Sequence, residues 1–302
     1  MSFIGLGKII LLGEHAVVYG YPALAAALDR GVRLDAVPTP AGGTLRVDIP
    51  IWSVKLTADD DHVLAQGLAA IADAIEVGRP PLTLVGDAQI PPGAGLGASA
   101  AFAVAIARAL LAHAGRPVDA AAISAAAGAS ERLLHGKPSG VDVALAIAGG
   151  VGVYRKASGL RAIGCAPLRV LVGPSGSPRS TARMIERVAA ATAGVDDDAR
   201  LRELGALCDA GTAALLAGRL DELGAAMNRA HDLLGGLGVS TPLLDGLCQA
   251  ARRVGAHGAK LTGAGGGGAV IAIAPREREA DVLAAWRTAG VQGFVATVGG
   301  RT

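Results

Sequence analysis

Residues 91 to 107, PPGAGLGASAAFAVAIA, constrain the fold of this chain more than any other segment. Gly93, Gly95 and Gly97 precede an alanine-rich run that predicts a helix. Glycine lets backbone N–H groups close around an anion, and the helix start adds unpaired donors and the positive end of a dipole. The segment therefore predicts a phosphate-binding loop that leads into a helix.

The composition indicates a large, close-packed core. The chain has 302 residues, of which 51% are apolar, so it can form one large or two ordinary domains. Aromatic residues make up only 3% and there are 44 glycines, so the core must be built from Ala, Leu, Val and Ile. The net charge of +2 creates no general attraction for nucleic acid, and any anion site must therefore be local.

The sequence predicts neither a membrane span nor a signal peptide. The longest uncharged runs, Ala16 to Leu28 and Pro91 to Ala107, are too short or too rich in Gly and Pro to cross a bilayer, which needs roughly 20 apolar residues. The N-terminus does not have the pattern of a signal peptide. Cys165, Cys208 and Cys248 form no C-x-x-C pair and leave an odd thiol. We therefore expect a cytoplasmic protein with no membrane or nucleic-acid partner.

The order of predicted elements indicates an α+β chain. In the first 160 residues we expect strands up to Leu12 and near 32–37, 44–51, 82–85 and 151–156, and helices over 16–28, 62–75, 98–113 and 118–134 and from Asp142. The second half predicts strands at 168–172, 269–273 and 293–298 and helices near 180–191, 197–216, 220–234 and 276–289, and Ser240 with Pro242 predicts the start of another helix. The weakly patterned connection 158–168 is the best boundary, which predicts domains 1–160 and 161–302.

A dinucleotide-binding loop is the first alternative for the glycines. Gly93, Gly95 and Ala98 satisfy G-x-G-x-x-A between a strand and a helix, but Asp119, the acidic residue about 20 positions later, lies at a helix start rather than a strand end. A Walker pattern is also missing from the sequence. The phosphate loop is therefore of another type.

Three segments together resemble the motifs of the GHMP kinases: GKIILLGEHAVVYG at 7–20, PPGAGLGASAA at 91–101 and KLTGAGGGGAVIAI at 260–273. Within that family, GEHAVVYG, ERLLHGKPSGVD and NRAHDLLGGLGVS are similar to the mevalonate kinases. The resemblance spans Lys8 to Ile273. It implies a two-domain α+β GHMP kinase fold, with an N-terminal ribosomal S5 domain 2-like domain, a C-terminal ferredoxin-like domain and an active site between them.

The resemblance also implies a function. It indicates ATP- and Mg²⁺-dependent phosphorylation of the primary hydroxyl of mevalonate in isoprenoid precursor biosynthesis. Asp142 would orient or deprotonate that hydroxyl, Lys8 would stabilise charge on the transferred group, and Ser99 with Glu131 would hold Mg²⁺. The nucleotide would bind to Pro92, Gly93, Ala94, Gly95, Leu96, Gly97, Ala98 and Ser99. Mevalonate would contact Glu14, His15, Thr181 and Gly265.

Several of these residues can also be interpreted without the resemblance. Lys8 lies in an apolar run, where a buried ammonium without a partner would cost several kcal/mol. Glu131 and Asp142 are separated by HGKPSG, which predicts a tight turn that brings the two carboxylates together. Taken alone, the residues allow simpler roles: a helix N-cap for Asp142, a solvated helix carboxylate for Glu131, a structural hydrogen bond for His15, a Ser/Thr helix cap at residues 180–181, and a tight turn for glycines 263–268.

One departure from the family pattern concerns the phosphate loop. The usual loop is GLGSSAA, whereas Ala98 replaces the first serine here and Ser99 is retained.

Other functions stay open: a GHMP kinase for a sugar or phosphomevalonate, a related decarboxylase, or a non-catalytic ligand sensor. Retention of Lys8, Ser99, Glu131 and Asp142 argues against a sensor. The sequence does not determine the oligomeric state, and a homodimer stays open.

Overall fold

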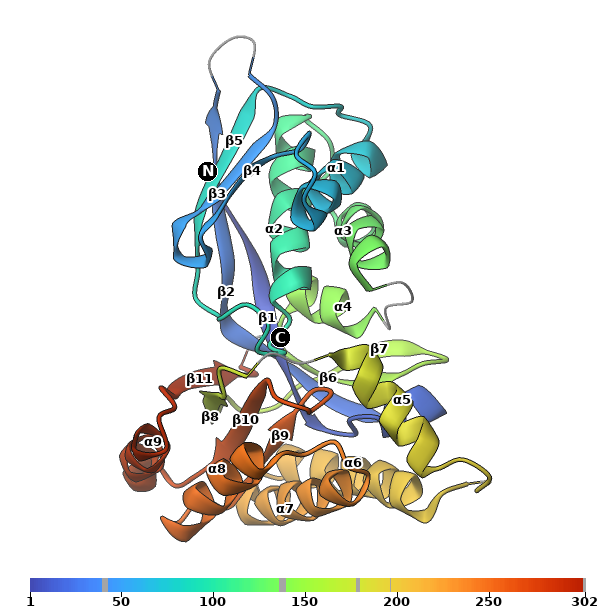
Figure 1. The fold of residues 1–302 in the computed structure, drawn as a ribbon, viewed down its shortest axis with the longest axis vertical. Coiled ribbons are helices and arrows are strands. Elements are labelled where there is room, and N and C mark those ends of the chain that lie inside the picture. Colours follow the sequence, from blue (N-terminus) through green and yellow to red (C-terminus); the bar gives the residue numbers. More distant parts are fainter. Residues whose placement is uncertain (40–42, 136–139, 178–179, 196, 301–302) are drawn as a thin grey trace. The chain divides into compact units, whose positions relative to one another are not determined.

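The structure, a computed structural model, describes residues 1–39, 43–135, 140–177, 180–195 and 197–300 (Figure 1). Helices and strands are mixed along the chain, which confirms the α+β class. The chain forms two compact units. The first contains Met1–Lys8, Arg30–Pro92 and Gly97–Gly149, and the second contains Ile9–Asp29, Gly93–Leu96 and Gly150–Thr302. The expected domains 1–160 and 161–302 stay a prediction.

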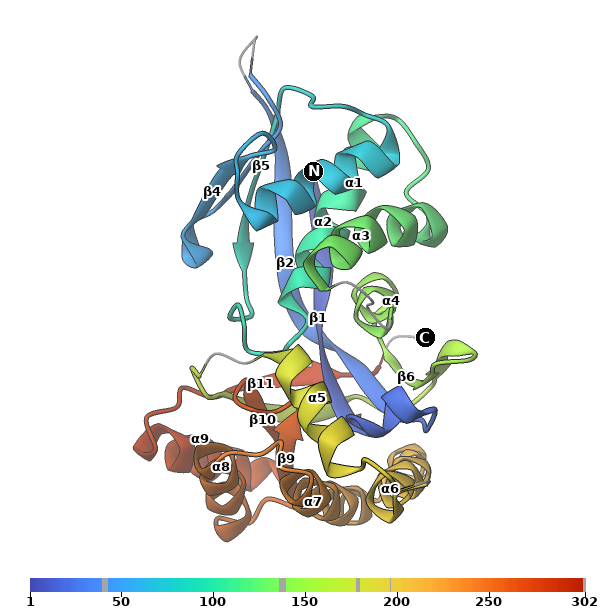
Figure 2. The ribbon, with the colours of Figure 1, turned by 45° about the vertical axis from the view of Figure 1, so that its right-hand side comes forward.

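The first unit places its helices against one side of a sheet (Figures 1 and 2). Strand β5 (Leu82–Ala88) pairs antiparallel with the second half of β2 (Ala23–Pro38) and parallel with β3 (Arg46–Ile49). Strand β3 pairs with β4 (Val54–Thr57), and β1 (Ser2–Leu12) pairs with β2. The helices are α1 (Val63–Ile75), α2 (Ala98–His113), α3 (Ala120–His135) and α4 (Val141–Ala148).

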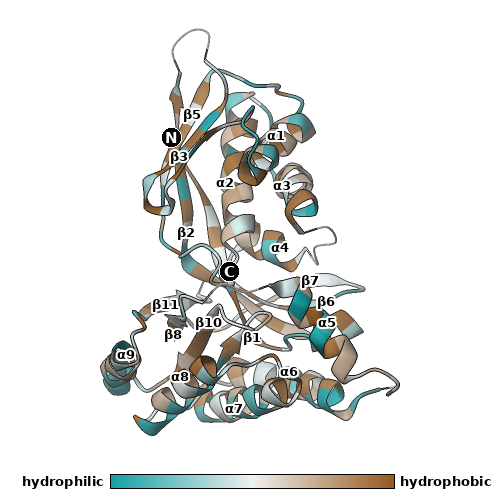
Figure 3. Cartoon of the chain, viewed as in Figure 1, coloured by the Kyte–Doolittle hydropathy of each residue, from teal (hydrophilic) through white to brown (hydrophobic). Residues whose placement is uncertain are grey.

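Small residues let helix α2 pack tightly in this unit. Eleven of its 16 residues are buried, most of them alanine, and the hydropathy colouring is apolar along most of its length (Figure 3). At Gly5 of β1, a Cβ atom would lie 2.0 Å from the carbonyl oxygen of Ala101. The close approach therefore requires glycine on the strand. Within the described residues, no helix is both long and apolar enough to cross a membrane.

The second unit is built around an antiparallel sheet in the order β11 (Phe294–Val298), β8 (Leu168–Pro174), β10 (Ala269–Ile273) and β9 (Gly258–Thr262). Its helices are α5 (Thr181–Ala191), α6 (Ala199–Leu216), α7 (Leu220–Gly236), α8 (Pro242–Arg253) and α9 (Glu279–Thr288). Strand β6 (Val151–Arg155) pairs with β7 (Gly159–Ile163) and with the first residues of β2. All residues of β9 and β10 are buried, and α7 and α8 pack on them.

The helix predicted over residues 16–28 is wrong. The chain forms a short 3-10 helix, η1 (Ala16–Tyr19), and then enters β2 at Ala23. Gly20 ends η1 in the left-handed region, at φ 95°. Residues 23–28 are buried on both faces of the strand, so their sequence has no polar alternation to distinguish a strand from a helix.

Short strands account for the other differences. The single strand expected at 44–51 is instead β3 and β4, separated by the 3-10 helix η2 (Pro50–Trp52). The expected connection 158–168 contains β7, and β9 was not predicted. A third 3-10 helix, η3 (Arg276–Arg278), precedes α9. The tight turn predicted for HGKPSG falls on residues 136–139, outside the described residues.

Candidate active site

The first unit brings Lys8 and Asp142 together. Lys8 lies on β1 with only 4% of its surface exposed, and its Nζ is 3.2 Å from Oδ1 of Asp142 on α4. Asp142 lies in the first turn of α4, whereas the N-cap is Gly140 and makes no side-chain cap hydrogen bond. The N-cap interpretation of Asp142 is therefore wrong. The Asp142 side chain remains about one third exposed, so it can contact both the buried ammonium and a ligand.

A second pair in the same unit joins Ser99 and Glu131. The Ser99 hydroxyl, in the first turn of α2, donates a hydrogen bond to Oε1 of Glu131 on α3. Glu131 is buried, so the solvated-carboxylate interpretation is wrong. One carboxylate and one hydroxyl are hard oxygen ligands that suit Mg²⁺, which takes few protein ligands when phosphate oxygens complete its shell. Among the described residues there is no cluster of three or more His, Cys, Asp or Glu able to hold a metal.

The glycine loop has a backbone conformation that fits a phosphate group. Gly93, Gly95 and Gly97 adopt φ of 72°, 79° and 75°, in the left-handed region that favours glycine. Gly97 is the N-cap of α2 and makes no side-chain cap hydrogen bond, so the first N–H groups of the helix can serve an anion. A Cβ on Gly97 would lie 2.8 Å from Cγ of Lys8, so glycine also makes room for that lysine.

The remaining predicted loop residues frame these glycines. Pro92 is exposed, Ala94 and Leu96 are buried, and Ala98 is half-buried at the first position of α2. Pro92 and Gly97 to Ser99 belong to the first unit, and Gly93 to Leu96 to the second.

In the second unit, Glu14 and His15 contact the segment 260–264. The Glu14 carboxylate forms an ion pair with the ammonium of Lys260 on β9, and both side chains are almost completely buried. His15 Nε2 donates to the carbonyl oxygen of Ala264 at 2.8 Å. His15 also adopts φ 60°, which is uncommon for a residue other than glycine. The structural hydrogen bond considered for His15 is therefore present, and a substrate contact by this residue stays a prediction.

Gly265 and Thr181 occupy different local environments. Gly265 has φ 79°, and a Cβ there would lie 2.1 Å from the carbonyl oxygen of Val239, so only glycine fits. Thr181 is the exposed first residue of α5. The N-cap is Ser180, whose hydroxyl accepts from the N–H of Arg183 at 3.3 Å. The Ser/Thr cap expected at this helix start is therefore present, on Ser180 rather than on Thr181.

Lys260 is a buried charged residue for which the sequence analysis predicted no contact. The segment KLTGAGGGGAVIAI is interpreted above through its glycines. Its lysine stands at the start of an apolar run, however, and like Lys8 it would need a buried partner. Burial lowers the pKa of the Lys260 ammonium below its ordinary value, and the adjacent Glu14 carboxylate opposes that shift. A second missed contact involves His231, which had no predicted role. Its Nε2 lies 3.1 Å from Oδ1 of Asp245, and its Nδ1 accepts from the N–H of Leu261.

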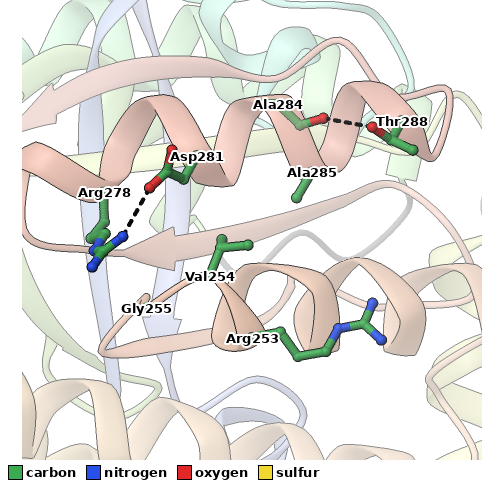
Figure 4. A pocket seen from close by; sticks show the side chains of 8 residues that line it. All are labelled: Arg253, Val254, Gly255, Arg278, Asp281, Ala284, Ala285 and Thr288. Carbon is green, nitrogen blue, oxygen red and sulfur yellow. Dashed lines mark hydrogen bonds and ion pairs between the residues drawn. The ribbon is translucent and has the colours of Figure 1, made fainter.

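A surface pocket of about 530 Å³ lies apart from these residues, between the end of α8 and α9 in the second unit (Figure 4). Its lining includes Arg253 and Arg278, and the Arg278 guanidinium pairs with Asp281 at 3.2 Å. None of the predicted site residues lines it.

Comparison with known proteins decides the family. The family model described as GHMP kinases N terminal domain matches residues 63–150, and the one described as GHMP kinases C terminal matches residues 212–292. The mevalonate kinase of Thermococcus sibiricus is 34% identical over 94% of this chain and 91% of its own length. The chain belongs to the GHMP kinase family. The mevalonate kinase of Aeropyrum pernix is 35% identical to this GHMP kinase, over 88% of the chain and 86% of its own length.

Solved structures agree with this assignment. The L. major mevalonate kinase in complex with R-mevalonate matches this GHMP kinase with a TM-score of 0.85 and 28% identity, over 99% of this chain and 96% of that one. The Methanococcus jannaschii mevalonate kinase matches with a TM-score of 0.84 and 25% identity, over 99% and 98% of the two chains. The family and fold expected from the three sequence motifs are confirmed.

Proposed function

We propose that this GHMP kinase is a mevalonate kinase that transfers the γ-phosphoryl group of ATP to the primary hydroxyl of mevalonate. The observation that carries the proposal is the Lys8–Asp142 pair, present in a chain that is similar to mevalonate kinases along nearly its whole length. The pair supports phosphoryl transfer to an alcohol as the reaction class. The likeness to mevalonate kinases, one of them solved with R-mevalonate, supports the choice of acceptor.

Asp142 is the proposed orienting group for the acceptor alcohol. Its carboxylate accepts a hydrogen bond from the hydroxyl, which directs an oxygen lone pair at the γ-phosphorus. As the new O–P bond forms, the bond from phosphorus to the bridging oxygen of ADP breaks, and the hydroxyl proton passes to Asp142. Lys8 offsets negative charge on the transferred group, because phosphoryl transfer depends mainly on positioning and electrostatics.

The phosphates are proposed to lie at the loop Pro92–Ser99 and the first turn of α2, where backbone N–H groups donate to their oxygens. Ser99 and Glu131 would hold Mg²⁺, which supplies charge neutralisation to the phosphate oxygens. Glu14, His15, Thr181 and Gly265 are the proposed mevalonate contacts.

We also propose a cytoplasmic setting for the enzyme. The three cysteines, all within the described residues, are free thiols, which agrees with that setting.

A substrate panel tests this function. Purified protein with ATP and Mg²⁺ is offered mevalonate, phosphomevalonate, galactose and homoserine in separate reactions, and ADP release is measured. We expect kcat/KM for mevalonate to exceed every other value by at least about 100-fold, which corresponds to about 2.7 kcal/mol of transition-state discrimination. A folded, ATP-binding protein that ignores mevalonate or prefers another acceptor would overturn the proposal.

A further inference from the structure

In the second unit, four side chains join the end of β1 and the residues after it to β9 and the loop that follows β9. The Thr262 hydroxyl accepts from the N–H of Ile10 at 2.9 Å and donates to the carbonyl oxygen of Ile10 at 3.0 Å. In addition, the Lys260 ammonium pairs with Glu14, and His15 donates to the carbonyl oxygen of Ala264. The position of Glu14 therefore depends on β9.

The Lys260–Glu14 pair is a poor device for stability alone. The side chains are 0% and 1% exposed, so both charges have lost their hydration. Replacing such a buried pair with apolar residues of similar volume is often neutral or stabilising. All five residues of β9 are buried, and Lys260 lies opposite Ile271 in the neighbouring strand β10, so an apolar side chain suits this position. The retained charges indicate a purpose other than packing.

The ammonium has two fixed acceptors. It donates to Oε1 of Glu14 and to the carbonyl oxygen of its neighbour Leu261, the second at 2.6 Å. These contacts hold the end of a long, flexible side chain in one place. Because the ammonium is buried and already paired, it does not act as a binding group for a phosphate or carboxylate of the substrate.

We propose that Lys260 is a positioning residue for the acceptor substrate: its ion pair with Glu14 fixes the turn that carries the neighbouring His15, a proposed mevalonate contact. The inference rests on the proposed function, because it places the turn that carries His15 beside the substrate. A contact group that is already held in one place loses less conformational freedom when the substrate binds than a mobile one. Lys260 acts through Glu14 and makes no contact with the reacting atoms.

The test compares steady-state kinetics of the wild type with those of Lys260→Met, Glu14→Gln and the double variant, with ATP and mevalonate varied separately. Methionine keeps the length of the side chain and removes the charge. We expect Lys260→Met to raise KM for mevalonate by about tenfold or more and to change KM for ATP by less than about threefold. Glu14→Gln should have a similar effect, and the double variant should be no worse than the worse single variant.

Lys156→Met, which changes an exposed lysine of the same unit, is the matched control and should leave both KM values unchanged. If the wild type is active and folded Lys260→Met has an unchanged KM for mevalonate, the inference is overturned but the proposed function stands. The same holds if the effects of the two single substitutions multiply in the double variant. A wild type without mevalonate turnover would overturn the proposed function as well. Should Lys260→Met not fold, the charge-neutral double variant decides: a KM for mevalonate like that of Glu14→Gln is expected, and a wild-type KM contradicts the inference.

Discussion

The Nζ atom of Lys8 lies 3.2 Å from Oδ1 of Asp142, and the two side chains differ sharply in exposure: 5% for the lysine and 35% for the aspartate. The buried ammonium is therefore held by a carboxylate that a ligand can still reach. A pair that served stability alone would not need one partner at the surface, and surface ion pairs contribute little. The geometry suits a carboxylate that receives a substrate hydroxyl.

Changing Asp142 to Asn should separate catalysis from nucleotide binding. The amide is similar in size but cannot accept the hydroxyl proton, so kcat should fall by at least about 100-fold. The dissociation constant for ATP, measured by calorimetry, should change by less than about threefold. Asp35→Asn, at an exposed position of β2, is the control and should keep wild-type kcat. A wild-type rate in Asp142→Asn would remove Asp142 from the mechanism.

Glu131→Gln should raise the requirement for Mg²⁺. The buried carboxylate bonded to Ser99 is the charged member of the proposed metal pair, so its neutralisation should raise the Mg²⁺ concentration for half-maximal rate by about tenfold or more. Initial rates are measured across a Mg²⁺ series at saturating ATP and mevalonate. Binding of ADP without metal serves as the control for folding. An unchanged Mg²⁺ dependence would place the metal elsewhere.

Ala98→Ser should tighten nucleotide binding. The residue is half-buried at the first position of α2, directly after the Gly97 cap, where a hydroxyl can donate to a phosphate oxygen. One added hydrogen bond is worth about 1 kcal/mol, so KM for ATP should fall by up to about fivefold. KM for mevalonate should stay within about twofold. A higher KM for ATP would show that this position does not face the phosphates.

Gly265→Ala should destabilise the protein more than Gly290→Ala. Both glycines adopt φ 79°, so both substitutions carry the cost of a left-handed residue, about 1–2 kcal/mol. Only at Gly265 does the added Cβ also meet a backbone atom, at 2.1 Å, whereas nothing lies within 4 Å at Gly290. Urea unfolding should show an additional loss of about 1–3 kcal/mol for Gly265→Ala. Equal losses would contradict the close contact with Val239.

Burial of His231 predicts a fall in stability at mildly acidic pH. Desolvation lowers its pKa in the folded chain, Arg252 and Lys260 act in the same direction, and Asp245 opposes them. The unfolded chain then binds the proton more readily, so the free energy of unfolding should decrease as the pH falls below about 6.5, by at most about 1.4 kcal/mol per pH unit from this residue.

The measurement is urea unfolding of the wild type, His231→Gln and the exposed control His113→Gln at pH 7, 6 and 5. The decline should be shallower in His231→Gln than in the other two proteins. Equal slopes in all three would show that His231 does not contribute to the decline.

The sequence predicted best where a residue was chemically out of place. Lys8 in an apolar run required a partner, and the glycines before α2 required a turn with positive φ, and both features are present. Lys260 and its partner Glu14 are 246 positions apart, and no local pattern indicates such a contact. Residues 23–28 and β9 are buried on both faces, so their composition does not distinguish a strand from a helix. The roles given to Glu131 and Asp142 came from the family resemblance.

The most direct measurement of the central claim is the identity of the product. Purified protein is incubated with ATP, Mg²⁺ and mevalonate, and the mixture is followed by phosphorus NMR and mass spectrometry. We predict a phosphomonoester whose phosphorus couples to the protons of one methylene group, formed in equal amount with ADP. ADP formed without that ester, or a phosphate carried on a different oxygen of mevalonate, would contradict the account.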